Sequence, residues 1–356
     1  MGSGNWLIYG AYGFTGELIT EAAVRRDHKP LLAGHSAKKL APLAERLNLD
    51  MVVFDLHDES RLNNTLEDVD LVLNAAGPFV RTALPIVRAC METGTSYLDI
   101  SGEVLVLEQI FTLDQQAREK GIAIIPGVGF NVLASDCLVR YAAEKIDNPT
   151  YLEIATQWAM DDMSPGSTKT MIEIFPSGTL ARRGGQLVRI NVRNWRRRQP
   201  FLDGEYTILP VTIGDLATAY KTTQIPNITT YMAFTERTAN SYSLMEPILR
   251  RLFGFGFVRR LASKRVENTS SRSEGYLQGR KTSQVWSLAR NEEGSESQAW
   301  LETVDSYLFT AEAGVRSVEK LVSEHKVGVL TPALAFGADF VLEIPGTKRV
   351  DRLEDV

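Results

Sequence analysis

Three glycines at every third position stand out near the start of this 356-residue chain, in the stretch GAYGFTG. They are Gly10, Gly13 and Gly16, and they follow the apolar run Trp6–Gly10. Glycine allows positive φ angles and lets the backbone come close to a ligand. Where such a turn opens a helix, the free N–H groups and the helix dipole attract phosphate. The spacing GxxGxxG therefore predicts a turn that holds a diphosphate, although an ordinary strand–helix turn is an alternative. The other residues of this turn are Ala11, Tyr12, Phe14 and Thr15.

The residues after the second expected strand bear on which dinucleotide would bind. A site selective for NAD usually places Asp or Glu there, about 20 residues beyond the glycines, on the ribose 2′-hydroxyl. This chain has LLAGHSAKKL instead, which contains no acid. His35, Ser36 and Lys38 offer hydrogen-bond donors and positive charge to a 2′-phosphate. The stretch favours NADP, with NAD as an alternative, and Lys38 and Lys39 can equally form a solvated helix face.

Later strand ends are expected to contact the same cofactor. Asp55, after the third strand, would bond adenine or cap the helix that follows. Ser101 and Gly102, after the fifth strand, would face the nicotinamide. The fourth strand runs into LNAAGPF, where small residues permit backbone contact with the cofactor. The cofactor-binding residues expected from that stretch are Ala75, Ala76, Gly77, Pro78 and Phe79.

Reduction of a C=O, C=N or C=C bond by a nicotinamide also needs a proton donor near the reacting carbon. Glu103 and Asp136 are the candidate donors on loops expected to border the nicotinamide. Asn131, like Ser101, could hydrogen-bond a substrate oxygen, and Lys169 in GSTKT could hold an acidic group. Each of these residues can equally serve as a local cap or belong to a surface ion pair.

The elements that must position these residues alternate regularly over the first 130 residues. Apolar runs interleaved with helical patterns predict a parallel sheet covered on both faces. Crossover connections are right-handed, so the expected fold is a Rossmann-type, doubly wound α/β sheet. The expected strands are Trp6–Gly10, Pro30–Gly34, Met51–Asp55, Asp70–Ala75, Ser96–Ile100 and Ile122–Pro126.

A helix is expected after Asn131, and from Tyr151 the pattern changes to strand-like runs without crossover helices. Such runs predict a second, α+β domain built on a largely antiparallel sheet. We therefore expect a dinucleotide-binding domain over 1–130, a substrate and dimerisation domain over 131–325, and a segment 326–356 that returns to the first domain. The polar stretches 196–198 and 268–281 are expected to be loops. The strand-like runs are 151–158, 187–192, 205–211, 228–234, 283–290 and 298–303.

The sequence resembles the saccharopine dehydrogenase-like oxidoreductases in the broad sense, and also the trans-acting enoyl reductases of polyketide assembly. The resemblance implies a nicotinamide-binding domain, a second α+β domain with the substrate site, and a homodimer. Members commonly have Arg where this chain has His35, which leaves NAD open. The stretches that carry the resemblance are GAYGFTG (10–16), LAGHSAKKL (32–40), NAAGPF (74–79), YLDISGE (97–103), PGVGFNVLASD (126–136) and TPALAFGADFVLEIPG (331–346).

Composition and charge argue against several classes of function. With a net charge of −5, no bulk attraction to nucleic acid or anionic lipid is expected. The four histidines and two cysteines show no metal-ligand spacing, so no metal site is expected. Neither a secretory signal nor an apolar run of about 20 residues is visible, which favours a cytoplasmic protein.

The segment 243–265, SLMEPILRRLFGFGFVRRLASKR, is basic and amphipathic. Such a stretch can lie on an anionic membrane surface or cover an apolar substrate cleft. Alternatively, its apolar side packs at a dimer interface or on the core of its own domain. The leading interpretation of the whole chain is an NADP-dependent oxidoreductase for a small organic or acyl substrate. The alternatives are a trans-acting enoyl reductase for carrier-bound acyl chains and a protein that senses the dinucleotide without turnover.

Overall fold

The computed structural model describes residues 5–157, 164–267 and 282–355. The chain forms two compact units. The first unit consists of the chain up to Leu133 together with Tyr307–Phe336, and the second of Ala134–Ser306 together with the chain from Gly337 onward. The loop expected over 268–281 and the end of the strand expected over 151–158 lie outside the described residues.

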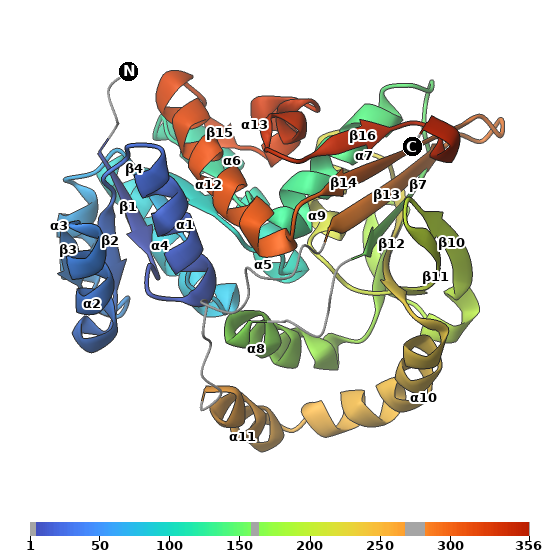
Figure 1. Cartoon of the computed structure of the whole chain (residues 1–356), viewed down its shortest axis with the longest axis horizontal. Helices are drawn as coiled ribbons and strands as arrows, with labels where there is room; N and C mark the ends of the chain where they lie inside the picture. Colours follow the sequence, from blue (N-terminus) through green and yellow to red (C-terminus); the bar gives the residue numbers. More distant parts are fainter. Residues whose placement is uncertain (1–4, 158–163, 268–281, 356) are drawn as a thin grey trace. The chain divides into compact units, whose positions relative to one another are not determined.

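The first unit is built on a seven-stranded parallel sheet with the order β15-β6-β5-β4-β1-β2-β3 (Figure 1). The chain runs outward from β1 to β3 and then restarts on the other side of β1 with β4. This order confirms the predicted doubly wound α/β fold. The strands are β1 Trp6–Tyr9, β2 Leu31–Gly34, β3 Met51–Val53, β4 Leu71–Asn74, β5 Ser96–Asp99, β6 Ala123–Ile125 and β15 Gly328–Val329.

Helices cover both faces of this sheet, because each strand is apolar on both sides. Leu7 and Val72 belong to a core cluster with Val87 of α4 on one face. On the other face, Gly314 of α12 brings the backbone of that helix against Leu73. The helices of this unit are α1 Phe14–Arg25, α2 Ala37–Leu47, α3 Glu59–Leu66, α4 Phe79–Thr93, α5 Val104–Phe111, α6 Asp114–Glu119, α12 Ser306–Ser323 and α13 Pro332–Phe336.

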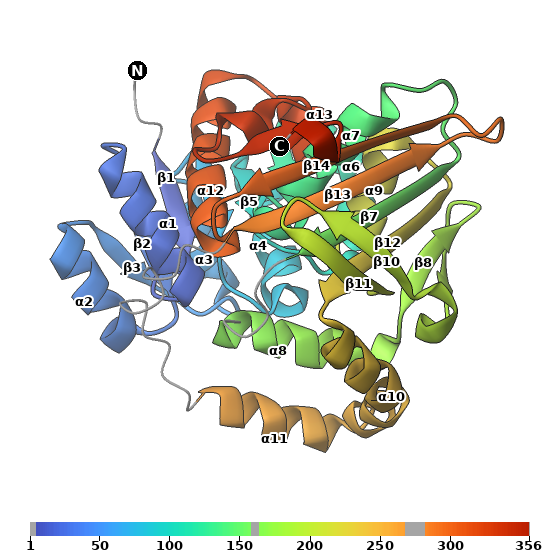
Figure 2. The same ribbon diagram turned by 45° about the vertical axis from the view of Figure 1, so that its right-hand side comes forward.

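The second unit holds a mixed sheet whose main path is β10-β11-β12-β7-β13-β14-β16, with β8 and β9 attached through β12 (Figure 2). The largely antiparallel sheet that the sequence predicts is confirmed, although β7 and β12 pair in parallel. The strands are β7 Tyr151–Gln157, β8 Leu180–Arg183, β9 Gln186–Arg189, β10 Arg197–Phe201, β11 Gly204–Pro210, β12 Asn227–Phe234, β13 Ser283–Arg290, β14 Glu296–Thr303 and β16 Lys348–Val350.

Helices of the second unit pack on its sheet and on one another. Helix α7 lies against β13, β14 and α9, whereas α10 contacts β11 and β12. A π-helical turn, Phe130–Ala134, leads into α7. The helices are α7 Ser135–Ala143, α8 Pro165–Ile174, α9 Asp215–Thr223, α10 Glu236–Phe253 and α11 Gly256–Glu267. No helix among the described residues is both long enough and apolar enough to span a bilayer.

Three expectations about the path of the chain need correction. The region 196–198 is not wholly a loop, since Arg197 opens β10 and its guanidinium pairs with Glu153. Helix α12 belongs to the first unit, so the second unit's main segment ends at 306 rather than 325. The segment 326–356 is divided between the units: β15 pairs with β6, but β16 pairs with β14. The pairing of strands determines where these segments lie. Because the paired residues are remote in sequence, local patterns do not predict it.

Candidate functional site

The glycine turn joins β1 to α1 and is closed by its own backbone. Gly10 adopts a φ of +84°, and its N–H donates to the Ala33 carbonyl over 2.8 Å. The N–H of Gly13 donates to the Gly10 carbonyl over 2.9 Å. A Cβ on Gly10 would lie 2.8 Å from that of Ala76, and one on Gly16 would lie 2.2 Å from the Gly10 oxygen. Only glycine fits at these two positions, which explains the spacing of the motif.

The turn presents the amino-terminal end of α1. Gly13 is the N-cap residue and brings no side chain that could bond the N–H groups of the first turn. The helix dipole adds partial positive charge at this end. An anion at this point would therefore meet both hydrogen-bond donors and a favourable field.

At the end of β2, an aromatic pair lies where a ribose would be recognised in this fold. The Tyr12 hydroxyl is 2.7 Å from Nδ1 of His35, and the Tyr12 ring fills the space that a side chain on Gly34 would need. Ser36 is the N-cap of α2, yet its side chain makes no cap hydrogen bond. Lys38 is exposed nearby on α2. Donors and a cation thus gather at the place where the sequence lacks an acid.

Asp55 does not cap the helix that follows it. Its Oδ1 accepts a hydrogen bond from the His57 N–H over 2.9 Å, which closes a short turn. The cap of α3 is Asp58, whose carboxylate accepts from the Arg61 N–H over 3.1 Å. The capping alternative for Asp55 is therefore wrong, and its exposed carboxylate leaves adenine contact as a prediction.

The loop after β4 is tied to the strand ends around it. The Ala75 N–H donates to the Tyr9 carbonyl over 2.8 Å, and the Thr82 hydroxyl donates to the Ala76 carbonyl over 2.6 Å. Gly77 is exposed and precedes a cis peptide bond to Pro78. Phe79 starts α4 and is buried. The small residues of this loop lie directly against the glycine turn, as the contact between Gly10 and Ala76 shows.

A buried polar network at the ends of β4, β5 and β6 escaped the sequence analysis. Asn74 donates to the Tyr97 hydroxyl, which donates in turn to Asp99 over 2.8 Å. The Asp99 Oδ1 accepts from the N–H groups of Ser101 and Gly127, each over 2.8 Å. Burial raises the pKa of the Asp99 carboxyl. Polar residues at the ends of otherwise apolar strands, LVLN and SYLD, were the available signal.

Glu103 and Asn131 lie in the first unit and differ in exposure. The Glu103 carboxylate is buried and accepts from the N–H groups of Phe79 and Val80 at 2.8 and 2.9 Å, so it caps α4. Asn131 is exposed in the π-helical turn, and its Cβ lies 3.3 Å from where a Cβ on Gly102 would be. The structure therefore brings Asn131 and Gly102 together, as expected of neighbouring loops.

Asp136 and Lys169 lie in the second unit. Asp136 is completely buried in α7 and accepts from the Thr222 hydroxyl over 2.6 Å. Lys169 is half-buried in α8, a helix capped by Ser164 through the Ser167 N–H. The described residues contain no cluster of His, Cys, Asp or Glu able to hold a metal ion.

The parallel sheet, its strand order and the closed glycine turn define the first unit as a Rossmann-type dinucleotide-binding domain. Residues 6–125 match the family model described as the saccharopine dehydrogenase NADP binding domain. This match confirms the predicted resemblance and the nicotinamide cofactor class.

Curated relatives match over the same part of the chain. A saccharopine dehydrogenase-like oxidoreductase of Bos taurus is 31% identical over 161 residues, which cover 40% of this chain and 38% of that protein. A trans-acting enoyl reductase of Mycobacterium ulcerans is 32% identical over 150 residues, covering 39% and 36%. The region of this chain that matches thus spans well under half of the length of each relative.

A solved structure supports the fold over almost the whole chain. The apo saccharopine dehydrogenase of Saccharomyces cerevisiae superposes with a TM-score of 0.63, covering 98% of this chain and all of that one. The sequence identity is 13%, so this likeness concerns the fold alone.

Proposed function

We propose that this protein is an NADP-dependent oxidoreductase that transfers a hydride between the nicotinamide and a small organic or acyl substrate. The observation that carries the proposal is the glycine turn, which has no room for side chains at Gly10 and Gly16 and opens α1 without a side-chain cap. The family of residues 6–125 and the names of the relatives support the same class of reaction.

The residues present fit a dinucleotide. Backbone N–H groups of the Gly10–Gly16 turn would hold the diphosphate, and the loop Ala75–Phe79 would support the cofactor where it crosses the strand ends. When bound, the nicotinamide supplies or accepts the hydride. Asn131, exposed beside Gly102, is our proposed hydrogen-bond partner for a substrate oxygen. The proton donor and anion-binding functions of Glu103, Asp136 and Lys169 stay predictions.

NADP rather than NAD is proposed from the end of β2. The Ser36 side chain makes no cap bond, and the Lys38 side chain is exposed. Both could donate to a 2′-phosphate, which no carboxylate in residues 31–40 would repel.

The test is a fluorescence titration of the full chain with NADPH and NADH, followed by a screen of carbonyl, imine and enoyl substrates for oxidation of NADPH. We expect tighter binding of NADPH and turnover in one substrate class. Failure of both coenzymes to bind folded protein would contradict the proposal.

One observation favours a second candidate function, dinucleotide sensing without turnover. Both predicted carboxylate donors, Glu103 and Asp136, are buried and engaged in hydrogen bonds. Tight NADPH binding without oxidation in any substrate class would support that function. Turnover only with carrier-bound enoyl chains would support the third, a trans-acting enoyl reductase, which is the name of the mycobacterial relative.

A further inference from the structure

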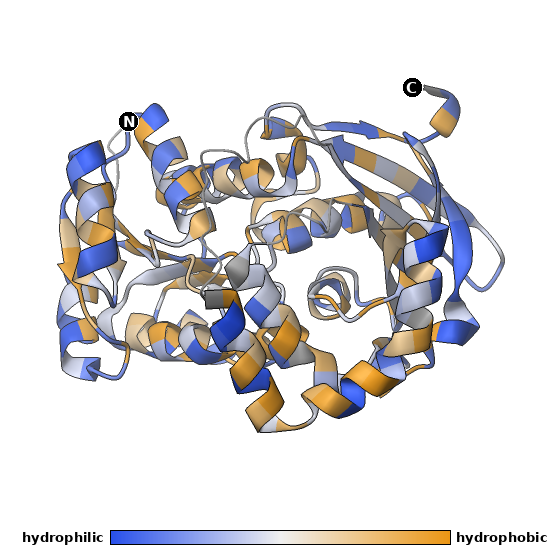
Figure 3. Ribbon diagram, turned by 60° about the horizontal axis from the view of Figure 1, so that its bottom comes forward, coloured by the Kyte–Doolittle hydropathy of each residue, from blue (hydrophilic) through white to orange (hydrophobic). Residues whose placement is uncertain are grey.

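The consecutive helices α10 and α11 expose an unusual amount of apolar surface. Of the sixteen large apolar side chains that are exposed among the described residues, seven lie between Leu244 and Leu261. Single exposed apolar residues are common on protein surfaces, but a cluster of them marks an interaction site. Figure 3 shows hydrophobic and hydrophilic residues side by side along these helices.

Spacing puts the exposed residues of each helix on one side. Leu244, Ile248 and Leu252 follow one another at intervals of four on α10 and are 66%, 62% and 48% exposed. Phe257 and Leu261 repeat the interval on α11, at 66% and 68%. We call these five residues the apolar α10–α11 face.

The core of the second unit accounts for the opposite side of α10 only. The Tyr242 ring stacks on Phe234, with the centroids 5.7 Å apart, and Phe253 meets Phe175 at the same distance. Glu246 is also buried on this side. Packing on its own core, one of the alternatives for this segment, therefore explains the inner residues, but none of the described residues covers the apolar α10–α11 face.

Charge indicates what covers that face. Residues 243–265 contain six basic residues and one acidic residue, Glu246, in a chain whose net charge is −5. Arg251, Arg260 and Lys264 are exposed, and none has an ion pair among the described residues. A symmetric contact with a second copy would bring these cations together. An anionic lipid surface would instead accept both the cations and the apolar residues.

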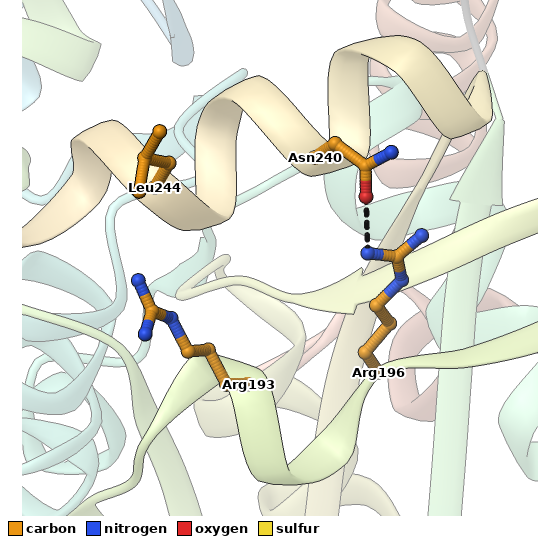
Figure 4. A pocket seen from close by; sticks show the side chains of 4 residues that line it. All are labelled: Arg193, Arg196, Asn240 and Leu244. Carbon is orange, nitrogen blue, oxygen red and sulfur yellow. Dashed lines mark hydrogen bonds between the residues drawn. The ribbon is translucent and has the colours of Figure 1, made fainter.

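A pocket of about 430 Å3 beside α10 presents two guanidinium groups. It is lined by Arg193, Arg196, Asn240 and Leu244, and Leu244 also belongs to the apolar α10–α11 face. Arg196 also lies 3.9 Å from the Glu236 carboxylate. Arg196 donates to the Asn240 Oδ1 over 2.6 Å, which fixes one guanidinium at the pocket wall. Figure 4 shows Arg193 and Arg196 extending toward the same side of α10. Guanidinium groups bind phosphate oxygens well.

We propose that α10 and α11 dock on anionic phospholipid bilayers, with the apolar α10–α11 face in the interface and a headgroup phosphate in the Arg193–Arg196 pocket. The inference does not depend on the proposed oxidoreductase activity. It predicts peripheral, salt-sensitive binding, because both the apolar contact and the cations contribute.

The test is flotation of the full chain with phosphatidylcholine vesicles, with and without phosphatidylserine. Two variants probe the two parts of the surface: Ile248→Ser with Phe257→Ser, and Arg193→Gln with Arg196→Gln. Their matched controls alter exposed residues of the same kind elsewhere: Leu105→Ser with Val322→Ser, and Arg61→Gln with Arg88→Gln.

We expect flotation only with phosphatidylserine. Each arginine removed from the pocket should weaken binding about fivefold. The apolar pair should weaken it by about tenfold or more, and the controls should bind as the parent does. Absence of flotation, equal flotation with neutral vesicles, or unimpaired variants would overturn the proposal. It would also fail if the serine pair turned a dimer into a monomer by light scattering without changing flotation, since the occupant would then be a second copy.

Discussion

Gly10 combines a positive φ angle with a contact that leaves no room for a side chain. Its φ is +84°, and an added Cβ would meet Ala76 at 2.8 Å. The conformation alone disfavours any L side chain by about 1 kcal/mol. The contact adds a second cost, because the loop after β4 must move to accommodate the methyl group. A side chain at residue 10 is therefore expected to lower both the stability of the fold and the affinity for the cofactor.

Gly10→Ala should weaken NADPH binding about tenfold or more and lower the free energy of unfolding by about 2–3 kcal/mol. The matched control is Gly94→Ala, at a φ of +79° with no atom within 4 Å of the new Cβ. Gly94→Ala should lose only the part of the free energy of unfolding that comes from the positive φ angle. It should keep the dissociation constant of the parent for NADPH. Fluorescence titration and urea denaturation measure both quantities, and equal binding by the two variants would contradict the argument.

Asp215 at the start of α9 carries a pH dependence of stability. Burial raises the pKa of its carboxyl to about 7, although the Ser135 hydroxyl donates to its Oδ1. The folded chain therefore holds a proton that the unfolded chain releases near pH 4. Stability from this residue is present at about pH 4 and is lost as the pH rises to about 7.

Asp215→Asn should remove that loss, because the amide stays neutral at every pH in this range. We expect the variant to be more stable than the parent at pH 8 and to show a flatter stability profile between pH 4 and 7. Urea denaturation across this range measures the effect, with Asp50→Asn at an exposed position as the control. Parallel profiles for the parent and Asp215→Asn would refute the assignment.

At the scale of elements, α4 begins without a capping side chain of its own. Its N-cap is Pro78, and the carboxylate of Glu103 supplies the acceptor that α4 lacks. A residue from the loop after β5 thus orders the start of the helix after β4. This bond also orients the loop Ala75–Phe79, which the cofactor is expected to contact.

Glu103→Ala should lower the free energy of unfolding by about 2 kcal/mol, because two N–H groups of α4 lose a charged acceptor inside the protein. Asp58→Ala, which removes the exposed cap of α3, should cost about 1 kcal/mol. Thermal and urea denaturation provide the measurement. If Glu103→Gln kept the parent stability but lost turnover, Glu103 would be the proton donor rather than the cap of α4.

We propose that the connection between β2 and α2 sets the preference between NADPH and NADH. Ser36→Asp would place a carboxylate where a 2′-phosphate is expected, and the like charges would repel. We expect NADPH binding to weaken about tenfold relative to NADH binding. Ser60→Asp on α3 is the control for added negative charge. An unchanged ratio of the two dissociation constants would show that the 2′-phosphate binds elsewhere.

At the scale of the molecule, the two units have separate sheets, and the residues proposed to hold the cofactor all lie in the first. Ligand binding stabilises the state that binds it, by about 2.7 kcal/mol at a hundredfold excess over the dissociation constant. We expect amide hydrogen exchange to slow most at the backbone N–H groups that contact the ligand. A homodimer and a cytoplasmic location stay predictions.

Saturating NADPH should slow amide hydrogen exchange in Gly10–Gly16 and Ala75–Phe79 of the first unit. Exchange in β13 and β14 of the second unit should stay at the rate of the free protein. Mass spectrometry of peptides from both units measures this difference. Protection confined to the second unit would contradict the proposed cofactor site.

The parallel sheet and the glycine turn could be predicted from the sequence, because their signals are local. A strand, a turn and a helix follow one another within residues 6–25, and the alternation of apolar runs with helical patterns predicts the parallel sheet. The glycine spacing could be interpreted because backbone conformation and helix dipole depend on neighbouring residues. The amphipathic character of 243–265 was visible for the same reason.

Contacts between remote residues were not readable in this way. Glu103 caps a helix that begins 24 residues earlier, and β16 pairs with β14 across the intervening α12 and β15. The exposure of Leu244, Ile248 and Leu252 likewise could not be predicted from their neighbours in sequence. Periodicity shows that a helix has apolar sides, but folding alone decides which side the core covers, because burial depends on what the rest of the chain brings against it.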